Sequence, residues 1–350
     1  MVKRVAFAVP GDLATPTGGY AYARRMIAEM RKLGWQIDVV YLGDGFPHPS
    51  METKTAAREN LLAVAKGCPV VVDGLALGVL PEAANELRER NPVLALVHHP
   101  LALETGLTPA DAEAMRKSER DALAAARGVV AVSPAVGQLL TDEYDVPPDA
   151  VTVVIPGTDR AETAKGSEDG IVRLVSVGSV VPRKGFDVLV AALAPIKSLP
   201  WRLTIAGDRT RDEAASAQLD ADIAANDLGA QIEMRGVLPA GRLAALYVGA
   251  DLFVLASRFE GYGMAYAEAL AHGLPIVGTT AGAIPDTVPP DAGILVEPSD
   301  VKALTRTLRM LIENPNERLW LASGARAAGE ALPGWEGQAK IFAGAIETLA

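Results

Sequence analysis

Short apolar runs that alternate with helical segments set the strongest limit on the fold of this 350-residue chain. In the first half, strand-like runs are expected at 2–9, 36–42, 69–72, 93–97 and 129–132. A second series is expected at 172–177, 203–206, 232–234, 252–255, 276–278 and 294–296. Continuous apolar strands separated by helices are typical of parallel sheets with helices on both faces. The sequence therefore predicts an α/β protein with two doubly wound parallel sheets.

A polar segment rich in small residues interrupts this alternation between residues 155 and 170. Such a segment is typical of a linker between domains. We therefore expect an N-terminal domain at 1–165 and a C-terminal domain at 166–332. In sheets of this kind, ligands bind beyond the carboxyl ends of the strands, so the loops that follow the strands are the candidate site.

The composition excludes several classes of protein. The chain has 33 Lys and Arg against 43 Asp and Glu, and this net charge of −10 argues against general nucleic-acid binding. Its single cysteine, Cys68, cannot form an internal disulfide and suits a reducing compartment. The sequence shows no signal peptide and no apolar stretch of membrane-spanning length. We expect a cytoplasmic protein, with peripheral contact at the inner face of a membrane left open.

Two carboxylates and a helix start lie close together within residues 251–280. Glu260 is expected in the loop after an apolar strand, and Glu268 in the helix that follows. Three backbone N–H groups at the start of this helix have no intrahelical partner, those of Gly263, Met264 and Ala265. An anion can bind these groups, and the helix dipole adds to the attraction. This segment indicates a phosphate site flanked by two acceptors for sugar hydroxyls.

A basic pair lies in the loop expected after the first strand of the second domain. This loop, GSVVPRKG at 178–185, carries Arg183 and Lys184. It is not a Walker A loop, which has Gly where Arg183 stands and Ser or Thr where Gly185 stands. Two adjacent cations at a strand end can neutralise a diphosphate, although a solvated basic pair is the alternative.

Three other loops at expected strand ends carry weaker candidates. Gly18 and Gly19 precede a helix, where backbone can approach an anion closely, yet alone they are better explained as a flexible turn. His98 could bind a substrate hydroxyl, but two adjacent histidines without further ligands do not define a metal site. Asp208 belongs either to a turn or to the site. The pair Asp220 and Asp222 falls within a helix and is interpreted as solvated surface, so no metal site is expected.

The spacing of Glu260 and Glu268 in EGYGMAYAE, together with PRKG at 182–185 and His98, resembles retaining glycosyltransferases of family 4. The resemblance extends over most of the chain and implies the GT-B fold, in which two Rossmann-like domains face each other across a cleft. The last helix of such proteins returns to the first domain, so residues 333–350 are assigned to the N-terminal domain. Two positions depart from the family: Gly157 follows Pro rather than Asn, and Arg127 stands where Asp is frequent.

The resemblance implies a role for each candidate residue. The catalytic residues would be His98, Glu260, Arg183 and Lys184. The substrate-binding positions would be Gly18, Gly19, Asp208, Leu238, Gly263, Met264, Ala265 and Glu268. Arg183 and Lys184 would bind the donor diphosphate, and Glu268 the ribose hydroxyls. Glu260 and His98 would contact the transferred sugar, with no metal or other cofactor required.

The implied reaction is transfer of a hexose from a UDP- or GDP-sugar to a hydroxyl acceptor by same-face attack, with retention of the anomeric configuration. The sequence does not choose between a sugar, a lipid-linked compound and a small molecule as acceptor. One alternative is a two-lobed protein that binds a sugar or nucleotide without catalysis. The other is an NAD-dependent oxidoreductase, although the glycine fingerprint of that class is absent.

Overall fold

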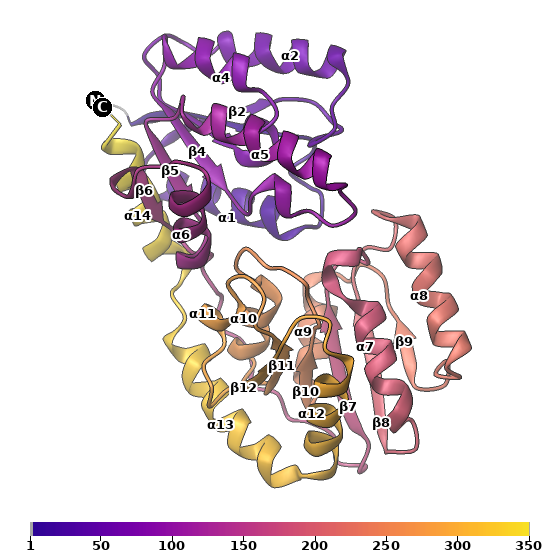
Figure 1. Cartoon of the computed structure of the whole chain (residues 1–350). Coiled ribbons are helices and arrows are strands. Elements are labelled where there is room, and N and C mark those ends of the chain that lie inside the picture. The colour runs from indigo at the N-terminus through magenta and orange to yellow at the C-terminus, as the bar shows by residue number, and fades with distance from the viewer. Residues whose placement is uncertain (1–2, 350) are drawn as a thin grey trace. The chain divides into compact units, whose positions relative to one another are not determined.

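The computed structural model describes residues 3–349 and confirms an α/β protein with two parallel six-stranded sheets (Figure 1). Met1, Val2 and Ala350, at the ends of the expected first strand and last helix, lie outside the described residues. The chain divides into two compact units. Unit 1 comprises the residues up to Gly157 together with those from Pro333 onward, and unit 2 is Thr158–Leu332.

Unit 1 contains the sheet with strand order β2-β1-β3-β4-β5-β6. Its strands are β1 (Arg4–Val9), β2 (Gln36–Tyr41), β3 (Val70–Asp73), β4 (Val93–Val97), β5 (Gly128–Ala131) and β6 (Val151–Val153). Its helices are α1 (Gly18–Lys32), α2 (Met51–Leu62), α3 (Gly74–Leu77), α4 (Pro81–Arg88), α5 (Pro109–Leu123), α6 (Pro134–Glu143) and α14 (Trp335–Glu347). Every residue of β3, β4 and β5 is buried, which explains their continuous apolar sequences.

Unit 2 contains the sheet with strand order β12-β11-β10-β7-β8-β9. Its strands are β7 (Val172–Val177), β8 (Trp201–Ala206), β9 (Ile232–Met234), β10 (Leu252–Val254), β11 (Ile276–Thr279) and β12 (Gly293–Val296). Its helices are α7 (Phe186–Leu193), α8 (Glu213–Ala225), α9 (Ala240–Val248), α10 (Met264–Ala271), α11 (Ile284–Thr287), α12 (Val301–Glu313) and α13 (Pro315–Ala331). The chain proceeds outward from β7 to β9 on one side and from β10 to β12 on the other, so the topological switch point lies between β7 and β10.

The last helix, α14, packs within unit 1 and appears in yellow in Figure 1. The Phe342 ring stacks on Phe7 of β1, with 6.1 Å between centroids, and Trp335 makes an edge contact with Tyr22 of α1. The guanidinium of Arg127 donates a 2.9 Å hydrogen bond to the carbonyl oxygen of Leu349. Arg127, one of the two departures from the family pattern, therefore stabilises the end of the returning helix.

Gly157, which directly follows the other departure at Pro156, allows close backbone packing. A Cβ atom at this position would lie 2.4 Å from the backbone nitrogen of Trp335, so only glycine fits where α14 begins.

The boundary between the units lies at Gly157, earlier than the position expected after residue 165. Backbone hydrogen bonds explain the difference, because Ala164 donates to the carbonyl of His272 and Lys165 to that of Val248. The polar segment interpreted as a linker is thus bound along the surface of unit 2.

None of the helices within residues 3–349 combines the length and apolar character needed to cross a membrane.

Replacing Phe342 by Ala is expected to lower the free energy of unfolding of unit 1 by about 3–5 kcal/mol, because it leaves a cavity in the core. Its neighbour Ile341 is 45% exposed, so Ile341→Ala is a matched control that should cost less than about 1 kcal/mol. Urea unfolding of both variants measures the difference. Equal losses would contradict a core role for α14.

Candidate active site

The loops that follow β7 and β10 meet at the switch point of unit 2. The turn after β7 contains the 3-10 segment Pro182–Lys184 and ends at Gly185, which has a left-handed φ of 65°. A Cβ atom at Gly185 would lie 2.0 Å from the carbonyl oxygen of Ala256 in the loop after β10, so this position requires glycine. The aliphatic stem of Lys184 lies against Gly178. The final glycine of PRKG thus allows two adjacent strand-end loops to touch.

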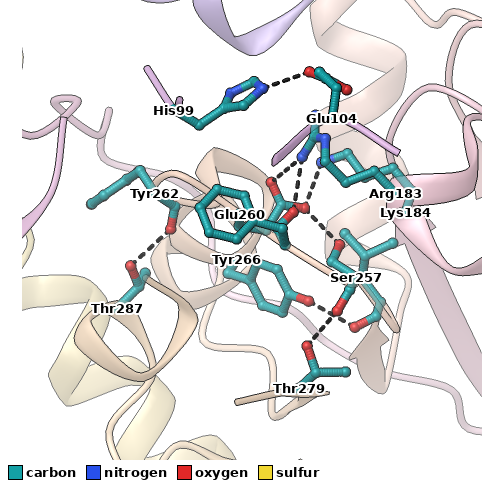
Figure 2. Close-up of polar contacts among 12 residues, drawn as sticks. His99, Glu104, Arg183, Lys184, Ser257, Glu260, Tyr262, Tyr266, Thr279 and Thr287 are labelled. Carbon is teal, nitrogen blue, oxygen red and sulfur yellow. Dashed lines mark hydrogen bonds and ion pairs between the residues drawn. The ribbon is translucent and has the colours of Figure 1, made fainter. Parts of the chain in front are cut away.

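Figure 2 shows Glu260 at the centre of a polar cluster with Arg183, Lys184 and Ser257. The carboxylate oxygen Oε1 accepts 2.6 Å hydrogen bonds from Lys184 Nζ and from the Ser257 hydroxyl. Arg183 Nη1 lies 3.3 Å from Oε2 and also donates to the carbonyl of Phe259. Glu260 is only 5% exposed. The structure therefore brings together three of the four predicted catalytic residues.

The environment keeps Glu260 ionised. Burial raises the pKa of this carboxyl, but the charges of Lys184 and Arg183 and the hydrogen bonds from Lys184 and Ser257 outweigh it and lower the pKa overall. Two fixed cations thus lie beside one carboxylate at the strand ends, an arrangement that suits a diphosphate.

Helix α10 begins directly after this cluster. Gly263 is its N-cap, with a left-handed φ of 89°, and the half-buried Met264 and Ala265 form its first turn. The hydroxyl of Tyr266 donates a 2.7 Å hydrogen bond to the carbonyl of Leu255 at the end of β10, which fixes the start of the helix relative to the strand. The helix therefore begins where the sequence predicts, four residues after Glu260.

The backbone of Glu260 is fixed by a segment that the sequence reasoning did not single out. Ala283, just before α11, donates its N–H to the carbonyl of Glu260 at 2.9 Å. A Cβ atom at Gly282 would lie 2.2 Å from the same carbonyl, and Gly282 has a left-handed φ of 56°. The sequence signal was the glycine in a loop following a predicted strand.

Glu268 lies in the second turn of α10 and is half-buried. Its Oε2 accepts a 3.1 Å hydrogen bond from the hydroxyl of Tyr247 in α9, whose ring stacks on that of His272. Burial raises the pKa of Glu268, and the hydrogen bond from Tyr247 offsets this only in part. Hydroxyl groups of a ligand would supply further donors to this carboxylate.

The remaining candidates of unit 2 lie at neighbouring strand ends. Asp208, after β8, accepts hydrogen bonds from the backbone and hydroxyl of Thr210, while its carbonyl accepts from the N–H of Val180. Its side chain thus stabilises its own turn, and its backbone joins that turn to the loop after β7. Leu238 follows β9 and is half-buried.

In unit 1, His98 and Gly19 lie together. A Cβ atom at Gly19 would lie 3.4 Å from the His98 ring, and the exposed Gly18 precedes it at the start of α1. Nε2 of His98 is 3.4 Å from Oδ2 of Asp73, a buried carboxylate at the end of β3. The Tyr22 ring contacts the imidazole edge-on. Sequence reasoning missed Asp73, although it directly follows the strand predicted at 69–72.

The second histidine of the pair has a separate contact, because His99 Nε2 lies 2.5 Å from Glu104 Oε1. The two adjacent imidazoles therefore have different partners.

In unit 2, Asp220 pairs with Arg209 and Asp222 accepts from Gln218, in agreement with a surface role. Within residues 3–349, no group of three or more His, Cys, Asp or Glu side chains is arranged to bind a metal ion.

Two units, each with a parallel six-stranded sheet, define the GT-B fold. Residues 158–328, almost all of unit 2, match the model of the family described as glycosyl transferases group 1. Unit 2 therefore carries the domain that defines this family.

Curated relatives agree with this assignment. The chain is 29% identical over 312 residues to an MMP alpha-(1->4)-mannosyltransferase of Mycolicibacterium hassiacum, an alignment covering 83% of this chain and 73% of that enzyme. It is 32% identical over 255 residues to a D-inositol 3-phosphate glycosyltransferase of Streptosporangium roseum, covering 66% of this chain and 58% of the relative. The chain thus spans less than two thirds of the length of the second relative.

Solved structures confirm the fold. Sucrose-phosphate synthase from Thermosynechococcus elongatus superimposes with a TM-score of 0.83 at 21% identity, covering 99% of each chain. HepE from Anabaena, in complex with UDP and glucose, superimposes with a TM-score of 0.78 at 17% identity, covering 99% of this chain and 100% of HepE.

Replacing Glu268 by Gln is expected to stabilise the protein at neutral pH. The pKa of Glu268 is higher in the folded than in the unfolded state, so its ionisation opposes folding as pH rises above the unfolded value of about 4.3. The melting temperature of Glu268→Gln should therefore exceed that of the wild type at pH 7 and match it below about pH 4. Thermal melts at both pH values measure this, and a destabilised variant at pH 7 would contradict the prediction.

Proposed function

We propose that the chain is a retaining hexosyltransferase of the family 4 type that takes its hexose from UDP-hexose or GDP-hexose. The observation that carries this proposal is the buried cluster of Glu260 with Arg183 and Lys184 beside the start of α10. Such a cluster offers two fixed cations and a helix N-terminus to one anion.

Departure of the nucleoside diphosphate is the step that this site suits. Cleavage of the anomeric bond increases negative charge on the departing phosphate, and groups already oriented toward that charge stabilise the transition state most. Arg183 and Lys184 are oriented by Glu260, and the backbone N–H groups of Met264 and Ala265 complete the positive surface. These groups bind the diphosphate and stabilise the charge that develops on it.

Glu268 is proposed to bind the ribose of the donor. Its carboxylate accepts one hydrogen bond from Tyr247, and the adjacent ribose hydroxyls would donate to the same group. Burial makes ionised Glu268 unfavourable in the unbound protein, so added donors favour its charged form. Leu238, after β9, is proposed to contact the base.

Glu260 has two proposed roles. Its ion pairs fix the two cations, and its position beside them lets it contact the transferred sugar as positive charge develops there. No separate nucleophile for a double displacement follows from the site, so attack on the same face, with the departing phosphate as the base, is the proposed route. His98, supported by Asp73, keeps its proposed contact with the sugar.

The relatives offer candidates for both substrates. One Corynebacterium glutamicum relative, 31% identical over 189 residues, is described as GDP-mannose-dependent, whereas the HepE structure contains UDP. Others are described as acting on D-inositol 3-phosphate. We propose a UDP- or GDP-hexose donor, and a sugar, a lipid-linked compound or a small polyol as hydroxyl acceptor.

Lys184→Ala and Glu260→Gln are each expected to lower the transfer rate by about 10²–10³-fold. The first removes a cation next to the departing phosphate, and the second removes the carboxylate that orients Arg183 and Lys184. The measurement is nucleotide release from UDP-glucose and GDP-mannose with D-inositol 3-phosphate or glucose as acceptor. Circular dichroism verifies that both variants fold, and Asp222→Asn on α8 serves as the surface control.

Near-normal release in both variants would contradict the proposed site. Tight binding of either donor without release, with acceptors supplied, would favour a protein that only binds nucleotide-sugars. Proton NMR of the product gives its anomeric configuration, and an inverted product would contradict the retaining mechanism.

Transfer is expected to continue at an unchanged rate after treatment with EDTA, because Arg183, Lys184 and the start of α10 supply the positive charge for the diphosphate. Rates before and after chelation test this. A loss of activity that added Mg²⁺ restores would overturn metal independence.

A further inference from the structure

An ion pair outside the predicted site joins the loop after β10 to the first turn of α7. Arg258, in the loop after β10, makes a two-point contact with Asp187 in the first turn of α7, with distances of 2.9 Å from Nη1 to Oδ1 and 2.6 Å from Nη2 to Oδ2. This is the planar geometry in which guanidinium and carboxylate groups pair most specifically. Arg258 and Asp187 are called the Arg258–Asp187 pair below.

Arg258 also binds the PRKG turn directly. Its Nη1 donates to the carbonyl of Pro182, and its backbone N–H donates to the carbonyl of Arg183 at 2.7 Å. Gly185 packs on the carbonyl of Ala256, two residues before Arg258. Residues on both sides of Lys184 are therefore fixed to the loop that carries Glu260.

The Arg258–Asp187 pair contributes little to the free energy of folding, so stability alone does not account for it. The side chain of Arg258 is 30% exposed and that of Asp187 48% exposed, and ion pairs at such exposure add little to the free energy of folding. Their location is more informative, because α7 and the loop after β10 follow neighbouring strands at the switch point. The pair fixes the separation of these two elements.

We propose that Arg258 and Asp187 are positioning residues for the diphosphate of the donor. They fix the PRKG turn so that Arg183 and Lys184 face the start of α10, and they act through those cations without touching the ligand. This inference rests on the proposed function. It adds two residues that do not contact the donor but hold the turn carrying Arg183 and Lys184.

A simple charge effect predicts a different pattern from a positioning effect. If only charge mattered, Arg258→Met would weaken diphosphate binding, Asp187→Asn would strengthen it, and the double variant would bind like the wild type. If the pair positions the turn, all three variants weaken diphosphate binding. Arg258→Lys should also weaken it, because an ammonium group cannot make the two-point contact.

Isothermal titration calorimetry of the full chain with UDP, UMP, GDP and GMP tests the proposal. The readout is the dissociation constant of each nucleoside monophosphate divided by that of the matching diphosphate. This ratio measures how much the second phosphate adds to the affinity. We expect each of the three variants to lower the ratio about tenfold while monophosphate binding changes by less than about twofold. Arg173→Met is the matched control, because it removes an exposed Arg–Asp pair at the opposite end of β7.

Three results would overturn the proposal. One is an unchanged ratio in the double variant, and another is tighter diphosphate binding in Asp187→Asn. The third is an equal loss for monophosphates and diphosphates, which would indicate a general structural role. Failure of the wild-type protein to bind any of the four nucleotides would instead overturn the proposed function, and this inference with it.

Discussion

The candidate site of unit 2 depends on the balance of charge around Glu260. Removing a carboxylate and two cations from water costs several kcal/mol per ion, and the cost is recovered only when each ion has well-placed partners. Here Ser257 and the two cations bind the carboxylate, Ala283 binds its backbone, and the glycines at 185 and 282 allow the backbones to approach closely enough. The conformations of the surrounding loops therefore follow from one requirement, that the buried carboxylate of Glu260 has a partner for each of its oxygens.

The two carboxylates of the site differ in a way that their similar sequence surroundings do not reveal. Both are acids near the start of α10, yet the pKa of Glu260 is lowered and that of Glu268 is raised. The difference follows from their partners, which are two cations for Glu260 and one phenol for Glu268. Glu260 is stabilised in the unbound protein, whereas Glu268 is left in an unfavourable state that a hydroxyl-rich ligand would relieve.

Much of the fold follows from local sequence. The bounds expected for β4, β7 and β9 agree with the structure. For β4 the reason is that a buried parallel strand is a continuous apolar run between polar loops. The strand β6, three residues at the sheet edge with Val153 37% exposed, was missed. Candidate site residues could be located from the sequence because ligands bind at the loops that follow the strands, and a chain has few such loops. Their partners Tyr247 and Asp73 could not be assigned, since each contact joins segments that only the folded sheets bring together.

The return of α14 to unit 1 has a consequence for the synthesis of the chain. Unit 2 is encoded entirely between the two parts of unit 1, so the ribosome completes unit 2 before α14 emerges. Because domains generally fold as units during synthesis, unit 2 can reach its final structure while β1 and α1 still lack the rings of Phe342 and Trp335. The N-terminal unit, although begun first, is thus the last to be completed.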